Sequence, residues 1–346
     1  MYSDVFIRDF AELGKRVSDM LNNSSDSYVL RESMEMSESE NNFFTFKMQR
    51  EALLAISQYM LNENALKGWL SRYSLSVTLK SSYIGVIAAG NIPAVCFHDI
   101  LSVLASGYKC EVKLSRRDSH LIPGIFSILA DINTFWSDRV VFKERISSST
   151  CALIAAGSDY TMKLIGSEFK NIPTLLRGTK SSVAVLSGDE DDKETDSLCD
   201  DIFLYFGMGC RSISRILVPE NYKFERLIDS SKRYTSLSEN RDFNASYRYQ
   251  KALMTMTGER FIDAGFFILS EECDFPPPLA VVGYQYYKNE NQIVEYLRSI
   301  EERIQIIEWS GREGCVDPGM SQKPSPDEYA DGIDTLSFIL RNAKNN

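Results

Sequence analysis

Histidine is scarce in this chain, since only His98 and His120 occur among its 346 residues. A Ser-His-Asp mechanism or a histidine-rich metal site has little to draw on, so any nucleophile has to be activated without a set of imidazoles. The seven cysteines contain no Cys-x-x-Cys pair. Their odd number and their spacing indicate neither a disulfide framework nor a zinc site, and we expect no metal.

Positive charge is in the minority, with 38 Lys and Arg against 48 Asp and Glu and a net charge of −10. Such a chain lacks the broad basic surface that nucleic acid requires, so nucleic acid is not an expected partner. Long apolar runs are absent too, and the first 21 residues carry charges within their apolar pattern. We therefore expect no transmembrane segment, no signal peptide and a cytoplasmic protein.

The first 75 residues are predicted to form a helical region. Apolar residues recur at three- and four-residue spacing along 5–21, a second helix is expected from Phe46 to about Leu61, and a short one near Trp69. Residues 22–42 are rich in Ser, Glu and Asn. That composition predicts a loop between the helices.

From Tyr83 the pattern changes to short apolar runs that alternate with helical patterns. Such alternation favours an α/β fold with a doubly wound parallel sheet, which binds ligands at the carboxyl ends of its strands. Buried strands are expected at 83–89, 110–114, 139–143, 151–156 and 182–186, with helices near 93–106, 119–133 and 159–168. The acidic run 188–201 is predicted to be a solvated loop beside a helix N-terminus.

A second, separate α/β block is predicted to follow. Its strands are expected at 212–218, 261–269, 278–284 and 304–309, with helices near 223–239, 245–257 and 290–301. The tail from Gly311 is assigned to packing or to an oligomer contact.

The chemistry is expected within residues 200–219, which read DDIFLYFGMGCRSISRILVP. An apolar helical run, a glycine-punctuated turn with Cys210 and a β-branched strand follow one another. Gly207 and Gly209 open backbone conformations that are closed to other residues, so the turn can aim the thiol. The alternative is that Cys210 is one more small buried residue.

Three further turns follow predicted strands, at Gly90-Asn91-Ile92-Pro93, at 113–117 and at Gly157-Ser158. Each lies at the carboxyl end of its strand, where such sheets bind ligands. Asn91 and Ser158 could instead cap the helices that follow them.

Together and in this order, these turns and Gly-Met-Gly-Cys at 207–210 resemble the aldehyde dehydrogenase superfamily. In particular, they resemble the acyl-CoA reductases of the bacterial luminescence fatty-aldehyde pathway. The resemblance covers roughly residues 83 to 310. It implies a Rossmann-type cofactor domain, a second α/β catalytic domain and a reaction in which an acyl-CoA thioester is reduced to an aldehyde.

The resemblance also implies a role for individual residues. Cys210 would be the nucleophile, and the Asn91 amide would stabilise an oxyanion together with the Cys210 N–H. The residues that resemble the family's nicotinamide-cofactor site are Lys113, Ser115, Gly157, Ser158, Gly178 and Thr179. Many NAD-preferring relatives carry a glutamate near Arg116, whereas an arginine could pair with a 2′-phosphate. We therefore expect NADPH to be preferred, with NADH as the alternative.

One segment departs from the family pattern. Residues 176–180 occupy the place of a glutamate followed by two glycines and a lysine, and the glutamate falls on Leu176. Since that glutamate activates the deacylating water in aldehyde-oxidising members, hydrolysis of an acyl-enzyme should be poor.

Four segments are predicted from these patterns: a helical region (1–75), a cofactor-binding domain (76–200), a catalytic thiol domain (201–310) and the tail (311–346). An acyl-CoA substrate and a homo-oligomer are the expected partners. A catalytically silent binding or assembly subunit, an aldehyde dehydrogenase and an acyl-phosphate reductase stay open as alternatives. Val95, Cys96, Phe97, His98 and Phe206 are guesses for the acyl pocket. His98 follows Asn91 by seven residues on the predicted helix and could share its face, but a core or surface histidine is the favoured interpretation.

Overall fold

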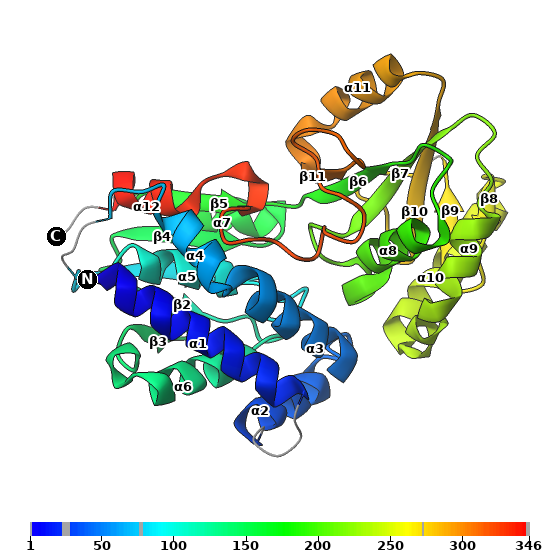
Figure 1. The fold of residues 1–346 in the computed structure, drawn as a ribbon. Coiled ribbons are helices and arrows are strands. Elements are labelled where there is room, and N and C mark those ends of the chain that lie inside the picture. Colours follow the sequence, from blue (N-terminus) through cyan, green and yellow to red (C-terminus); the bar gives the residue numbers. More distant parts are fainter. Residues whose placement is uncertain (1, 23–27, 76–78, 272, 344–346) are drawn as a thin grey trace. The chain divides into compact units, whose positions relative to one another are not determined.

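The computed structural model describes residues 2–22, 28–75, 79–271 and 273–343 (Figure 1). The chain divides into two units, one made of 1–179 and 323–346 and the other of 180–322. This division differs from the four segments expected from the sequence. The N-terminal helices and residues 329–343 pack with the first sheet, whereas the strand expected at 182–186 pairs within the second.

The first unit contains a five-stranded sheet in the order β3-β2-β1-β4-β5, and all its neighbouring strands are parallel. β1 and β4 lie side by side at its centre, and the chain winds outward from them in opposite directions. This is the doubly wound arrangement predicted from the sequence, with its topological switch point between β1 and β4. The strands are β1 (Tyr83–Ile87), β2 (Lys109–Lys113), β3 (Val140–Phe142), β4 (Ala152–Ala156) and β5 (Thr174–Arg177).

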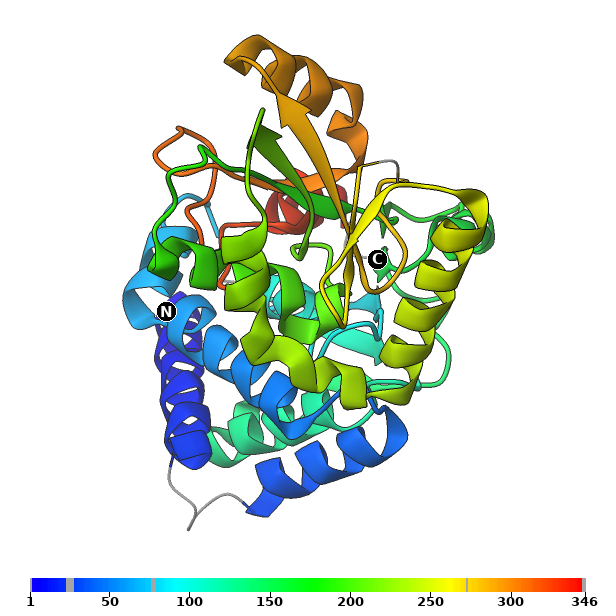
Figure 2. The same cartoon turned by 90° about the vertical axis from the view of Figure 1, so that its right-hand side faces the viewer.

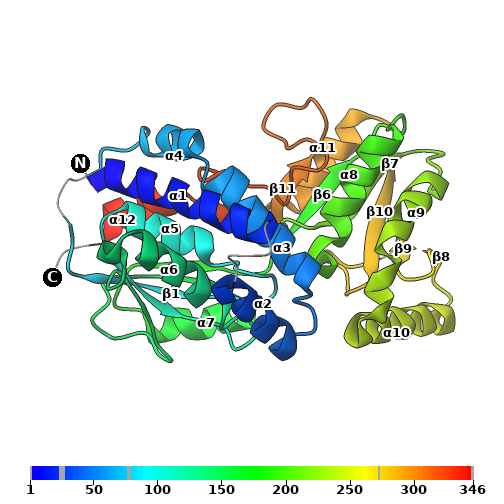
Figure 3. The same cartoon turned by 60° about the horizontal axis from the view of Figure 1, so that its bottom comes forward.

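Helices cover both faces of this sheet. α5 packs on β1 and β2, while α7 packs on β4 and β5, and Figure 3 shows β1 between α6 and α7. The helices of the unit are α1 (Tyr2–Asn22), α2 (Tyr28–Glu40), α3 (Phe46–Ala55), η1 (Ile56–Met60), α4 (Glu63–Leu70), α5 (Phe97–Ala105), α6 (Leu121–Ile132), η2 (Thr134–Trp136), α7 (Asp159–Glu168), η6 (Ala330–Gly332) and α12 (Thr335–Asn342).

The predicted loop at 22–42 is wrong for its second half, because residues 28–40 form α2. Leu30, Met34 and Ser37 recur at helical spacing and are buried. α2 packs so closely on α6 that a Cβ added at Gly124 would lie 2.3 Å from Ser33 Oγ. Packing of this narrow apolar stripe therefore overrides the polar composition of the segment. Residues 23–27 lie outside the described part.

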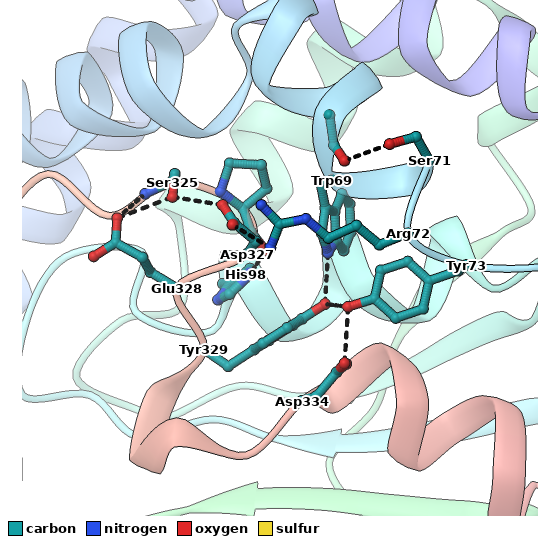
Figure 4. Close-up of polar contacts among 12 residues, drawn as sticks. Trp69, Ser71, Arg72, Tyr73, His98, Ser325, Asp327, Glu328, Tyr329 and Asp334 are labelled. Carbon is teal, nitrogen blue, oxygen red and sulfur yellow. Dashed lines mark hydrogen bonds and ion pairs between the residues drawn. The ribbon is translucent and has the colours of Figure 1, made fainter. Parts of the chain in front are cut away.

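The C-terminal segment returns to the first unit through a partly buried polar network (Figure 4). The Tyr329 hydroxyl accepts a hydrogen bond from Trp69 Nε1 (2.5 Å) and shares one with the Tyr73 hydroxyl (2.8 Å). Tyr73 also donates to the Asp334 carboxylate (2.9 Å), and Arg72 pairs with Asp327 (2.7 Å). These contacts give the end of the predicted tail a packing role in this unit.

The second unit contains a six-stranded sheet in the order β11-β6-β7-β10-β9-β8, parallel except for the antiparallel pair β8–β9. Figure 2 shows the gold strand β10 beside the green strand β7. The elements of this unit are β6 (Ser181–Val185), α8 (Asp192–Phe203), η3 (Leu204–Gly207), β7 (Ile213–Pro219), α9 (Glu225–Ser231), η4 (Lys232–Glu239), α10 (Arg241–Thr257), β8 (Phe261–Asp263), β9 (Ile268–Ser270), β10 (Val281–Tyr287), α11 (Glu290–Ser299), η5 (Glu301–Arg303) and β11 (Ile304–Glu308).

One strand predicted in this unit is in fact a hairpin. Residues 261–269 read as a single apolar run, but Gly265 has φ +92° and reverses the chain between β8 and β9. The Ala264 N–H donates to the Phe267 carbonyl (3.0 Å), which closes the turn. A glycine inside an apolar run thus acts here as a turn residue.

Candidate active site

Cys210 lies in a tight turn between η3 and β7, where it is partly exposed. Three successive residues before it, Tyr205, Phe206 and Gly207, have φ values of 56°, 57° and 71°. The left-handed region is unfavourable for the two aromatic residues, at a cost of order 1–3 kcal/mol each, and such strain is found mostly at functional sites. Gly207 therefore takes the left-handed conformation that the sequence analysis expected, whereas Gly209 has no positive φ, and the strain lies on Tyr205 and Phe206.

Hydrogen bonds to three consecutive residues, 210–212, hold this turn in place. The Cys210 carbonyl accepts a hydrogen bond from Ser182 Oγ (2.9 Å), Arg211 Nε donates to the Ser321 carbonyl, and Ser212 Oγ accepts from Gln322 Nε2 (3.3 Å). Residues 210–212 are thus fixed from β6 and from the segment after β11. We name 205–212 the Cys210 turn.

Ser182 reaches Cys210 because the sheet is irregular at this point. The pairing of β6 shifts register next to Ser182, and the pairing of β11 shifts between Ile304 and Ile307. The Ile306 N–H donates instead to Ser182 Oγ (3.3 Å). Irregularities of this kind often lie beside active sites, where they redirect a side chain.

Asn91 lies in the first unit, in the turn that follows β1. Sequence reasoning expected the helix to open at Pro93, but α5 begins at Phe97, and Ala94 has φ 55°. The Asp118 carboxylate accepts a hydrogen bond from the Ala94 N–H (2.8 Å) and so holds this strained turn. Asn91 therefore precedes the helix by six residues and does not cap it.

Asp118 is a residue that the sequence analysis did not select. It is buried, and burial raises the pKa of its carboxyl to about 7, although the Ala94 N–H and the nearby His120 act in the opposite direction. A buried carboxyl that titrates near neutrality is a frequent property of functional sites. Little in the sequence indicated this burial, because an aspartate that follows two arginines is typical of a solvated turn.

The ends of β1 and β2 approach each other closely. A Cβ added at Gly90 would lie 2.2 Å from Ser115 Oγ, so only glycine fits there. Lys113, the last residue of β2, is half-buried, and Arg116 is exposed in the turn that follows. Ser115 Oγ accepts a hydrogen bond from the Arg117 N–H (3.2 Å). Gly90, in close contact with Ser115, is partly exposed, and cationic side chains lie beside it. Such an arrangement fits the ribose and phosphates of a dinucleotide.

The ends of β4 and β5 are joined through Asp159, the first residue of α7. A Cβ added at Gly178 would lie 2.3 Å from Asp159 Oδ1, which also accepts the Thr179 N–H (2.7 Å). Gly157 donates its N–H to the Arg177 carbonyl (3.1 Å). Ser158 caps α7 by accepting from Thr161 N–H (3.3 Å), as its capping alternative predicted.

All the candidate cofactor residues therefore lie at one edge of the first sheet. Residues 90–91, 113–116, 157–158 and 178–179 follow β1, β2, β4 and β5, whose parallel directions bring their carboxyl ends to the same side. The exposed N-terminus of α7 and the cations 113, 116 and 117 are the groups there that fit phosphates. Asn91 shares this edge, whereas Cys210 belongs to the other unit.

Leu176 packs in the first unit without contributing any acid or base. Its side chain joins an apolar cluster with Leu153 and Ile165, and a Cβ added at Gly166 would lie 3.0 Å from Leu176 Cδ1. The next residue, Arg177, is buried in an ion pair with Asp99 and also donates to Thr335 Oγ1 (2.6 Å). These two side chains therefore serve packing around β5.

The residues guessed for an acyl pocket have structural roles in most cases. Cys96 and Phe97 are buried in the core of the first unit, and His98 stacks on Tyr329 while its Nε2 meets the Pro326 carbonyl (2.8 Å). Phe206 packs on Phe243, with ring centroids 5.7 Å apart. His98 and Asn91 do not share a helix face, since Asn91 precedes α5.

The acidic run before Cys210 is only partly solvated. Asp191 and Glu194 form a reciprocal cap at the start of α8, in agreement with the expected stabilisation of a helix N-terminus. Asp201, however, is buried, and so is Glu308 at the end of β11. Sequence reasoning missed both carboxyls.

Among the residues that the structure describes, no group of three or more His, Cys, Asp or Glu side chains is placed to hold a metal ion. Among the helices of the same residues, none combines the length and the apolar character that crossing a bilayer requires.

Comparison with solved structures finds similar folds at low sequence identity. An NAD-dependent aldehyde dehydrogenase from Sinorhizobium meliloti is 12% identical with a TM-score of 0.64, over 90% of this chain and 71% of that protein. Aldehyde dehydrogenase 21 from Physcomitrella patens, solved with the reaction product succinate, is 11% identical with a TM-score of 0.64, over 97% and 84%. An oxidoreductase from Marinobacter aquaeolei is 12% identical with a TM-score of 0.65, over 95% and 81%.

No protein-family model matches the chain, and no curated protein matches it. Identities of 11–12% speak to the fold alone. The expected fold class is thereby confirmed: the chain has an aldehyde dehydrogenase-like α/β fold.

Proposed function

We propose that this protein is an acyl-CoA reductase that forms an aldehyde through an acyl group carried on Cys210. The observation that carries the proposal is the strained turn that presents the partly exposed Cys210 thiol at the start of a parallel strand, in a fold shared with aldehyde dehydrogenases. The apolar packing of Leu176 supports reduction over hydrolysis, because a leucine cannot accept a proton from water.

The first half-reaction uses this chain's own residues. The Cys210 thiolate attacks the thioester carbonyl, and a tetrahedral oxyanion forms. The Asn91 amide and the Cys210 N–H are proposed to donate to that oxyanion, and each donor contributes about 3 kcal/mol in comparable acyl-transfer sites. The carbon–sulfur bond to CoA then breaks, CoA leaves as a thiol after taking up a proton, and a new thioester remains on Cys210.

The second half-reaction requires a reduced nicotinamide. Lys113, Ser115, Gly157, Ser158, Gly178 and Thr179 are the residues proposed to bind it, with Arg116 facing a 2′-phosphate in NADPH. When bound, that cofactor supplies a hydride to the acyl carbon. The bond to Cys210 Sγ then breaks, so the aldehyde leaves and the Cys210 thiolate is restored. We also propose that the enzyme is cytoplasmic and forms a homo-oligomer.

The test is a burst experiment without nicotinamide. The protein is mixed with acyl-CoA thioesters of several chain lengths, free CoA is followed with a thiol reagent, and the digested protein is examined by mass spectrometry. We expect one equivalent of CoA per active chain, an acyl adduct on the peptide with Cys210, and its discharge as aldehyde when NADPH is added.

Two variants make this test specific. Cys210→Ala should lose the burst and the adduct, whereas Cys273→Ala removes another partly exposed thiol of the same unit and should keep both. An adduct on a different cysteine, or steady release of free acid without nicotinamide, would remove the basis for the mechanism. A Cys210 that is inert toward every thioester would favour the binding or assembly subunit.

A further inference from the structure

Two buried acidic residues lie behind the Cys210 turn in the second unit. Asp201 belongs to the last turn of α8, and Glu308 is the final residue of β11; each is 1% exposed. They come from elements more than a hundred residues apart in the sequence, and neither has a role in the proposed chemistry. Burying two carboxyls together without a cation is costly unless they exchange a hydrogen bond or one is neutral.

The two carboxyls have different surroundings. Asp201 Oδ2 accepts hydrogen bonds from the backbone N–H groups of Gly319 (2.6 Å) and Ser321 (3.4 Å). Neither carboxyl oxygen of Glu308 has a protein hydrogen-bond donor among the described residues. The ionisable groups that face Glu308 are Asp201 from α8 and Asp317 from the segment after β11, both acidic.

The chemistry of two facing carboxyls limits how they can interact. Ionised carboxylates only accept hydrogen bonds, so two of them repel, whereas a protonated carboxyl donates to an ionised one. Asp201 already accepts hydrogen bonds from two backbone N–H groups, whereas Glu308 has no such donor. Burial, with the charges of Asp201 and Asp317, raises the pKa of Glu308 well above its usual range. A single proton shared by the two carboxyl groups would give each of them a hydrogen-bond partner.

The pair is connected to the Cys210 turn through residues 317–322, which we name the closing segment. Gly319 has φ +84°, and a Cβ added there would lie 2.9 Å from Ser197 Cβ on α8, so only glycine brings its N–H to Asp201. The next residues of the same segment bond the turn itself, through Ser321 to Arg211 and through Gln322 to Ser212. Gln322 Nε2 also donates to the Asp201 carbonyl (3.4 Å).

We propose that Glu308 and Asp201 share one proton at neutral pH, and that this pair positions Cys210 by holding the closing segment against α8. Asp201 and Glu308 are positioning residues in this scheme, since neither touches the reacting atoms. The positioning role rests on the proposed function of Cys210, whereas the shared proton does not depend on it.

The shared proton is tested through stability. Glu308→Gln replaces the protonated carboxyl with a neutral amide that still donates to Asp201. Because the folded state of the wild type keeps a proton that the unfolded chain releases above the ordinary glutamate pKa, wild-type stability should decline as the pH rises, until the pH passes the raised pKa of folded Glu308. Relative to Glu308→Gln, the folding equilibrium constant should fall by up to tenfold per pH unit in this window.

Denaturant unfolding from pH 5 to pH 8.5 measures this difference. Glu302→Gln, an exposed change in the turn before β11, is the matched control and should track the wild type at every pH. A gap between wild type and Glu308→Gln that is constant with pH, or that favours the wild type as the pH rises, would overturn the shared proton.

Positioning is tested by the rate of the CoA burst. Asp201→Ala leaves the Gly319 and Ser321 N–H groups without their acceptor, and we expect the burst to slow by about tenfold or more. Asp200→Ala is the control, since Asp200 is half-exposed and bonds Arg233 and Tyr234 instead. Glu308→Leu should slow the burst similarly, and Glu308→Gln should restore it.

The two failures can be told apart. If the wild type shows no burst with any thioester, the proposed function fails, yet the pH-dependent gap of Glu308→Gln still decides on the shared proton. Should Asp201→Ala not fold, the comparison of Glu308→Leu with Glu308→Gln decides on positioning. Equal burst rates in those two variants would show that the pair serves stability alone.

Discussion

The Asp118 carboxylate accepts a hydrogen bond from the Ala94 N–H (2.8 Å), and Ala94 has φ 55° in the turn that carries Asn91. A side chain from the turn after β2 thus holds a strained backbone after β1. Because Asp118 is buried, loss of its acceptor leaves an N–H without a partner in a place that water does not reach. The conformation of the turn beside Asn91 therefore depends on a residue 24 positions away in the sequence.

Replacing Asp118 should change the pH dependence of stability. Burial raises the pKa of Asp118 from 3.8 to about 7, so the folded wild type holds a proton between these values that the unfolded chain has lost. Relative to Asp118→Asn, the wild type should lose on the order of 4 kcal/mol as the pH rises from about 4 to about 7, and no more above it. Denaturant unfolding across that range measures the loss; a flat difference would contradict the raised pKa.

Asp118→Ala separates the hydrogen bond from the charge. Without an acceptor for the Ala94 N–H, Asp118→Ala should be about 1–3 kcal/mol less stable than the wild type near pH 4, before the wild type begins to lose stability. Asp118→Asn keeps an acceptor oxygen and should lose less below pH 5. If the two variants were equally stable there, the Ala94 contact would contribute nothing.

Asn91→Ala should slow acylation of Cys210 by roughly a hundredfold without abolishing it, because one of two oxyanion donors is removed. The rate of the CoA burst measures the effect. Asn62→Ala is a matched control, since Asn62 caps α4 on the surface and has no proposed part in the reaction. A wild-type burst rate in Asn91→Ala would exclude Asn91 from the oxyanion site.

Arg116→Glu should reduce the preference for NADPH. An exposed arginine that pairs with a 2′-phosphate gains a charge-assisted contact, and a glutamate there would repel the phosphate, so the NADPH-to-NADH ratio of kcat/KM should fall about tenfold or more. Lys170→Glu makes a similar change after α7, at the amino end of β5, and should leave the ratio as it is. An unchanged ratio in Arg116→Glu would mean that the arginine does not face the cofactor.

Leu176→Glu should destabilise the first unit by about 2–4 kcal/mol, since a carboxylate would replace a side chain packed against Gly166 and the cluster around Leu153. Leu176→Met keeps the volume and should cost less than about 1.5 kcal/mol. Thermal unfolding compares the two. In the folded fraction of Leu176→Glu, free acid should increase relative to aldehyde, and a wild-type product ratio would show that position 176 has no access to the acyl group.

Much of the fold could be predicted because the strands are short, apolar and separated by clear turns. β1, β2, β4 and β7 lie within two residues of their expected bounds, whereas the strand order, with its switch point between β1 and β4, comes from the structure. Local composition gave the wrong secondary structure where packing or a turn residue determined the conformation. It indicated a loop where α2 forms and a single strand where Gly265 reverses the chain.

The sequence by itself determined where the turns after β1 and β4 lie and which residue is the candidate nucleophile, because glycines between apolar runs and the glycine-rich stretch before Cys210 are features that a linear pattern records. Only the tertiary structure decided which distant side chains hold those turns. Asp118 meets Ala94, and Glu308 meets Asp201, through contacts between separate elements. Burial is a property of the assembled fold, so an acidic residue that looks solvated in a linear pattern becomes a buried, proton-holding group only once its neighbours are in place.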